Sequence, residues 1–149
     1  MTSYIAADLR RFVESRANRL CEYCLIHEDD TFLGCQVDHV IAEKHGGQTH
    51  ADNLSYACTF CNRAKGTDIG SIAPSTGEFT RFYNPRTDQW LDHFALNGVA
   101  IEPRTPIGEA TVRILGFNDA ERILERLMIH NAGRYPPDEA LEHMTRHGE

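Results

Sequence analysis

Four of the five cysteines lie in two pairs that share one spacing. Cys21 and Cys24 form the first C-x2-C pair, Cys58 and Cys61 form the second, and 33 residues separate the two pairs. Two intervening residues permit a tight turn, here called a knuckle, that directs both thiolates at one ion. Four thiolates complete the tetrahedral set that Zn²⁺ prefers in closed, structural sites. We therefore expect one structural zinc, with Cys35 left as a packed core thiol.

The segment between the pairs carries the residues that could do chemistry. Asp38 and His39 end one apolar run, Asn53 precedes another, and Asn62 directly follows the last cysteine. Metal-assisted hydrolysis needs a general base for water and a Lewis acid on the substrate. Asp38 and Asn62 offer the hard oxygens that Mg²⁺ or Mn²⁺ prefers, and His39 is the candidate general base. Because Asp38 and His39 are neighbours, the strand must end, twist or bulge there.

Each residue alone also has a simpler interpretation. His39 would suit a partly buried structural histidine, and Asn53 a turn. Asn62 would suit a helix N-cap, and Lys65 a solvated charge. Their joint occurrence, in Val-Asp-His-Val-Ile, His-Gly-Gly-x5-Asn-Leu and Ala-Cys-x2-Cys-Asn-Arg-x-Lys-Gly, favours a catalytic set.

Together these motifs, between about residues 18 and 68, resemble the HNH endonuclease family, in its zinc-containing branch whose last motif residue is Asn. The resemblance implies a ββα-metal finger of treble-clef type, a single catalytic divalent ion and phosphodiester hydrolysis. It also implies that Asn53, as the middle motif residue, organises the loop behind His39. A looser resemblance to the tails of small bacterial HNH proteins extends from Phe82 to Val112.

Charge limits how the chain could hold nucleic acid. The 15 Lys and Arg against 22 Asp and Glu give a net charge of −7, which excludes a strongly basic coat. Binding would come from a local set and be weak and salt-sensitive. The candidates for phosphate contact are Lys44, Arg63 and Lys65, with Arg10, Arg11, Arg16 and Arg19 of the first helix as a further stripe.

Hydrophobic patterning predicts the elements that position these residues. Residues 4–19 have the spacing of an amphipathic helix, and strand-length apolar runs lie at 32–33, 37–41 and 54–57. Residues 69–77 look like a loop and the nearest thing to an internal boundary.

The second half predicts smaller elements. Short strands or turns are expected at 79–83, 90–96 and 99–101. Asn118 to Glu121 fits a capping box for a helix that Gly133 ends. That helix should present one apolar face, and a short polar helix should follow Pro136-Pro137. The face would contain Ile123, Leu124, Leu127 and Met128, and His130, His143 and His147 are expected in or near surface helices.

The sequence thus predicts an α+β chain with a zinc-stapled core at residues 1–70, including the N-terminal helix, and an α/β extension at 71–149 packed on it. The leading function is a metal-dependent endonuclease acting on nucleic acid, with DNA favoured. A non-catalytic zinc module that binds nucleic acid or a protein, and a finger that serves only as a structural hub, stay open. No membrane-length apolar run and no signal-peptide pattern occurs, so we expect a cytoplasmic protein.

Overall fold

The computed structural model describes residues 4–146; the predicted surface residue His147 lies outside the described residues. Three two-stranded antiparallel sheets and six α-helices make up the described chain, in agreement with the predicted α+β class. The helices are α1 (Ala7–Arg16), α2 (Thr59–Lys65), α3 (Trp90–His93), α4 (Pro106–Leu115), α5 (Ala120–Asn131) and α6 (Asp138–Thr145), and the strands are β1 (Cys35–His39), β2 (Leu54–Cys58), β3 (Gly70–Ile72), β4 (Phe79–Arg81), β5 (Phe94–Asn97) and β6 (Ala100–Pro103).

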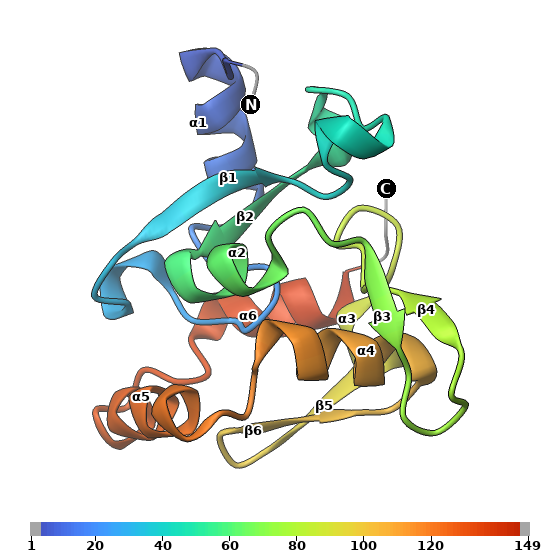
Figure 1. Ribbon diagram of the computed structural model, residues 1–149. Helices are drawn as coiled ribbons and strands as arrows, with labels where there is room; N and C mark the ends of the chain where they lie inside the picture. Colours follow the sequence, from blue (N-terminus) through green and yellow to red (C-terminus); the bar gives the residue numbers. More distant parts are fainter. Residues whose placement is uncertain (1–3, 147–149) are drawn as a thin grey trace.

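The β1–β2 hairpin lies between α1 on one side and α2 on the other (Figure 1). Its register is regular from Cys35 opposite Cys58 to His39 opposite Leu54. Leu54 and Tyr56 pack with Val13 of α1 in a small apolar cluster. Opposed residues of an antiparallel pair share a face, so Val37 and His39 lie on the same face as Tyr56 and Leu54. Gln36 and Asp38, at the alternate positions of β1, therefore turn towards α2.

Residues 69–77 are partly a strand, which corrects the prediction of a loop. β3 pairs with β4 from Gly70 opposite Arg81 to Ile72 opposite Phe79. The short span was hidden because Gly and Ser dominate it, and cross-strand pairing rather than propensity decides such strands. The predicted strand or turn at 90–96 divides into α3 and β5, and no strand forms at 32–33.

Helix α5 forms where predicted, but its faces are reversed. Leu124, Leu127 and Met128 are 57%, 41% and 66% exposed, whereas Arg122 and Arg126 are buried. The predicted capping box is also absent, because no side chain caps the helix. Asn118 instead donates to the carbonyl of Ile101 at 2.8 Å and accepts from its amide at 3.0 Å. The arginines are buried because each has specific acceptors, which apolar periodicity does not reveal.

Helix α6 is more deeply packed than the predicted polar helix, since Ala140, His143 and Met144 are buried. The main core draws on both halves of the chain: it joins the four paired cysteines and Leu20 to aromatic side chains such as Trp90 and Phe94. In Figure 1, α4 and α6 lie beneath α2, and β5–β6 closes the opposite end of the molecule. Across residues 4–146, the helices are too short or too polar to cross a membrane.

Candidate metal centre and active site

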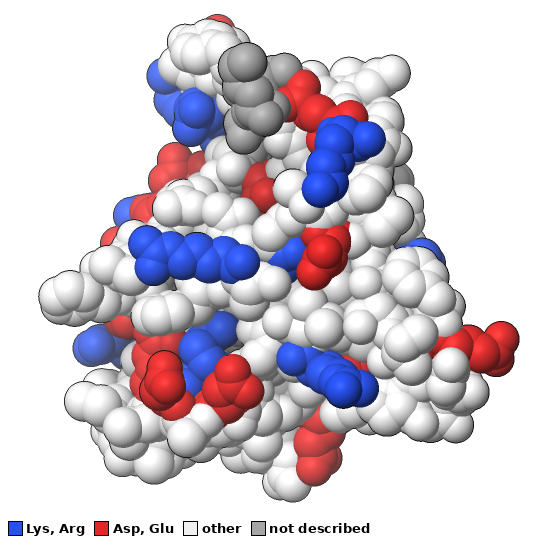
Figure 2. All heavy atoms as spheres, in the orientation of Figure 1, with Lys and Arg blue, Asp and Glu red and all other residues white. Residues whose placement is uncertain are grey.

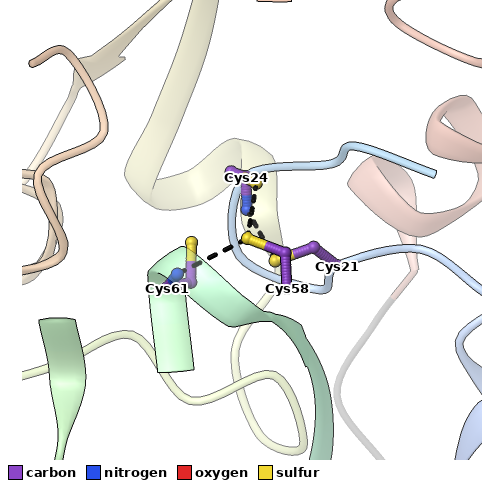
Figure 3. Close-up of side chains that lie close together, drawn as sticks. All are labelled: Cys21, Cys24, Cys58 and Cys61. Atoms are coloured by element: carbon purple, nitrogen blue, oxygen red, sulfur yellow. Dashed lines mark hydrogen bonds between the residues drawn. The ribbon is translucent and has the colours of Figure 1, made fainter. Parts of the chain in front are cut away.

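The four predicted zinc ligands converge in the core. Cys21 and Cys24 come from the first knuckle, Cys58 from the end of β2 and Cys61 from α2, and their sulfurs all lie within 4.8 Å of one another (Figure 3). Sulfurs bound at 2.3 Å to a tetrahedral zinc stand about 3.8 Å apart. The 3.7 Å between the sulfurs of Cys24 and Cys58 fits that geometry. The four cysteines are therefore positioned to bind a metal ion of the size and softness of zinc.

The first knuckle is held by side chains from the second half of the chain. His143 Nε2 lies 3.1 Å from the carbonyl of Glu22, Trp90 Nε1 donates to that of Tyr23 at 2.9 Å, and the Tyr135 hydroxyl donates to that of Cys24 at 2.8 Å. The prediction of a surface position for His143 is wrong, because its side chain is buried against the knuckle. Burial lowers the pKa of His143.

A buried ion pair adds to the contacts that hold the first knuckle. Glu22, inside the first knuckle, is fully buried and pairs with Arg86. Its other carboxylate oxygen accepts from the amide of Tyr56 at 2.9 Å. Sequence reasoning missed both charged residues, although an acid between two paired cysteines and an arginine in an aromatic-rich segment were visible signals.

Helix α2 lies along the face of β1 that carries Asp38. Lys65 Nζ donates to Asp38 Oδ2 and to the carbonyl of His39, both at 2.9 Å. One turn earlier, Asn62 donates to the side chain of Gln36. Residues three apart on α2 thus meet residues two apart on β1, and Asn62 lies on the same face as Asp38. Burial raises the pKa of Asp38, and the Lys65 ammonium opposes that rise without cancelling it.

His39 is the last residue of β1, so the strand ends at this residue, which is one of the three options that the neighbouring Asp38 required. The ring is buried, with Nε2 2.9 Å from the hydroxyl of Thr49. The regular register turns His39 to the face opposite Asp38. Sequence reasoning missed Thr49, since a lone threonine in a polar loop carries no motif.

Asn53 ties together the loop that carries Thr49. Its amide group donates to the carbonyls of Ile41 and Gln48 and accepts from the amide of Ile41, each at 2.9 Å. A Cβ on Gly47 would stand 1.8 Å from the Ile41 carbonyl oxygen, so only glycine fits there. These contacts account for the His-Gly-Gly-x5-Asn pattern as a closed loop behind His39.

The basic candidates are placed unequally. Lys44 and Arg63 are exposed, and neither forms an ion pair within residues 4–146, whereas Lys65 is only 2% exposed. The arginines of the first helix and its end are engaged locally: Arg10 donates to the Ile5 carbonyl, Arg11 pairs with Asp8, Arg16 donates to Ala51 and Leu54, and Arg19 pairs with Glu28. Blue and red side chains are interspersed on the face in Figure 2, which bears no continuous basic surface.

Residues 21–68 match the family model described as HNH endonuclease. The match spans both knuckles, the β1–β2 hairpin, the loop held by Asn53 and helix α2, and it ends before β3. Comparison with curated proteins and with solved structures found no match for the chain. The matched family is a nuclease family whose domains typically act on nucleic acid and use a divalent metal. Residues 21–68 of this chain are therefore similar to an HNH endonuclease domain.

Proposed function

We propose that the protein is a metal-dependent endonuclease that hydrolyses phosphodiester bonds, with DNA as the favoured substrate. The observation that carries this proposal is the placement of Asp38 and Asn62 on one face between β1 and α2, with His39 at the adjoining strand end. The hairpin, α2 and the two knuckles also support the ββα-metal, treble-clef description. A family match over residues 21–68 makes this nuclease chemistry the first expectation.

Asp38 and Asn62 are the proposed ligands of a Mg²⁺ or Mn²⁺ ion. Carboxylate and amide oxygens are hard donors, and two protein ligands leave room for water and a phosphate oxygen. When bound, the ion supplies Lewis-acid stabilisation of charge on the phosphate. Lys65 favours the ionised form of Asp38 but competes for one of its oxygens. We therefore expect the ion to be weakly held and readily exchanged.

His39 is the proposed general base. In the tautomer that is protonated at Nε2, the Nε2–H group donates a hydrogen bond to the Thr49 hydroxyl. Nδ1 then keeps the lone pair that can accept a proton from water. Thr49 then fixes both the tautomer and the ring orientation, and Asn53 and Gly47 hold the loop from which Thr49 acts. Thr49, Asn53 and Gly47 are positioning residues in this account.

Arg63 and Lys44 are the proposed phosphate contacts, because both are exposed and neither forms an ion pair within residues 4–146; Arg63 directly follows Asn62, and Lys44 lies in the segment that follows His39. Lys65 would reach a phosphate only by leaving Asp38. Two such contacts give modest affinity that falls with salt and reads no sequence.

One observation favours the alternative of a non-catalytic nucleic-acid-binding zinc module. The buried Lys65 ammonium already satisfies Asp38, as it would in a purely structural ion pair. In that case the knuckles and α2 would present Arg63 to a phosphate and no bond would be cleaved.

Nicking of supercoiled plasmid separates the two functions. Zinc-loaded protein should convert the plasmid to open circles with Mg²⁺ or Mn²⁺, and His39→Ala should reduce the rate by roughly 10²- to 10⁴-fold at unchanged zinc content. His130→Ala, at an exposed position of α5 where the ring hydrogen-bonds, among residues 4–146, only to the Tyr135 carbonyl, is the control and should cleave normally at unchanged zinc content. Wild-type cleavage by His39→Ala contradicts the base assignment, and binding without cleavage by the native protein favours the alternative.

A further inference from the structure

A buried arginine from the second half of the chain faces the cysteine cluster. Arg122 of α5 has its Nη2 3.2 Å from the sulfur of Cys24, 3.6 Å from that of Cys58 and 3.7 Å from that of Cys61. Its side chain is 6% exposed. Only this cationic side chain among residues 4–146 has hydrogen bonds to those sulfurs, and it lies more than fifty residues beyond the HNH match.

The charge of a zinc tetrathiolate explains why an arginine belongs there. Four thiolates around Zn²⁺ carry a net charge of −2, and such a charge is costly in a buried site without a compensating group. One guanidinium halves that charge and donates hydrogen bonds to three of the four sulfurs. Groups that hydrogen-bond to metal ligands in this way tune both the affinity of the site and the reactivity of its ligands.

The guanidinium is also held in place before any ion is considered. Its Nε lies 3.5 Å from Glu125 Oε1, and its Cζ lies 5.4 Å from the ring centre of Phe60. Phe60 lies between the two cysteines of the second knuckle, so the Arg122 side chain contacts both a residue of its own helix and a residue of the cysteine site. This preorganisation means that little side-chain entropy is lost when the hydrogen bonds form.

We propose that Arg122 is an outer-sphere component of the zinc site, through which α5 tightens zinc binding and lowers the nucleophilicity of the thiolates. The proposal rests on zinc at the four cysteines and is independent of nuclease activity. It also explains why α5 buries the face that carries Arg122: that face contacts the cysteine site.

Arg126 provides a matched control from the same helix. It is also buried, but donates to the carbonyls of Val99 at 2.7 Å and Phe117 at 2.6 Å, and within residues 4–146 it has no hydrogen bond to a sulfur. Arg126→Met therefore removes a buried arginine and weakens the packing of α5 without changing the charge at the thiolates.

The test uses the full chain loaded with Zn²⁺ or Co²⁺. Arg122→Met should bind zinc roughly 10- to 100-fold more weakly in competition with a chelator. Because zinc affinity is coupled to folding, the specific readout is the thiolate-to-cobalt charge-transfer band. Loss of the hydrogen bonds raises the energy of the sulfur lone pairs, so this band should shift to longer wavelength and thiol alkylation should accelerate. Arg126→Met should leave the band in place.

Arg122→Lys keeps the proposal testable if Arg122→Met fails to fold. A lysine retains the charge but has one compact donor group in place of the guanidinium fork, so band position and zinc affinity should lie between those of the native protein and Arg122→Met. An unshifted band in the folded Arg122 variants overturns the proposal. An equal shift in Arg126→Met also overturns it, because the effect would then come from helix packing.

Discussion

The cysteine centre and the Asp38–His39 edge lie at opposite ends of β2 and are held in opposite ways. Around the centre, three successive carbonyls of the first knuckle each accept a hydrogen bond from a side chain more than sixty residues away. Around the edge, the partners of Asp38, His39 and Asn53 all lie between residues 36 and 65. Long-range contacts thus restrain the cysteine centre, whereas the edge is built from one short segment whose contacts can open locally.

The two regions meet through α2. Cys58 accepts from the amide of Cys61 at 3.4 Å, and this contact begins the helix that carries Asn62 and Lys65 to β1. A rigid centre can thus set the geometry of the edge without touching it. The contrast makes separable predictions: damage to the centre should unfold the chain, and damage to the edge should spare the fold.

The largest effect should follow removal of zinc by a strong chelator. A structural zinc site contributes on the order of 10 kcal/mol to folding, so at least residues 20–70 should unfold. Because the core joins both halves, we propose that residues 71–149 lose protection in the same transition. Hydrogen exchange with and without the chelator measures this, and a protected C-terminal half in zinc-free protein would show two independent units.

The next effect concerns the buried pair of Glu22 and Arg86. Arg86→Met should destabilise the zinc-loaded protein by roughly 3–5 kcal/mol, because it leaves a buried carboxylate without its partner. Denaturant unfolding measures the loss. Adding Glu22→Gln to Arg86→Met should recover part of it, and a double variant no more stable than the single one would contradict the ion-pair account.

At the edge, Gly47→Ala should reduce nicking while sparing zinc content. The added methyl group collides with the Ile41 carbonyl and displaces the loop that holds Thr49, and a displacement of about 1 Å can lower a rate by roughly 10²-fold. Gly77→Ala, at a turn with open space around the Cβ position, is the control for a methyl group that meets no neighbouring atom; because Gly77 has a positive φ and Gly47 does not, this control also carries backbone strain that Gly47→Ala lacks. Equal activity of the Gly47 variant would mean that the loop does not position the base.

The smallest effect is a pH dependence at His143. Burial lowers its folded-state pKa, so below about pH 6.5 the unfolded chain binds a proton that the folded chain resists. Its contribution to stability should be intact above that pH and decline as the pH falls towards the folded-state pKa. His143→Gln keeps a donor near the Glu22 carbonyl but does not titrate, so unfolding curves should show a shallower loss between about pH 7 and pH 5.5. Parallel curves would contradict this origin.

Local patterns predicted the zinc centre and the HNH motifs because knuckles, the Asp-His pair and the Gly-Gly loop are each set within a few residues. α1 and the separate strand segments of β1 and β2 followed from apolar patterning for the same reason, whereas their pairing was implied only by the family resemblance. The side-chain hydrogen bonds to the carbonyls of the first knuckle could not be predicted, since Trp90, Tyr135 and His143 reach it only through tertiary packing. The reversed face of α5 has the same cause: Arg122 and Arg126 are buried by acceptors that lie far away in the sequence.

The most direct test of the proposed nuclease is to separate the two metal requirements. Mild EDTA should abolish plasmid nicking while one zinc per chain is retained, because the four buried thiolates form a closed site and Asp38 with Asn62 forms an open one. Activity should return on addition of Mg²⁺ or Mn²⁺ without added zinc. Nicking that persists in EDTA would contradict the account. So would a zinc-replete protein that binds DNA and never cleaves it with any divalent ion between about pH 6 and pH 9.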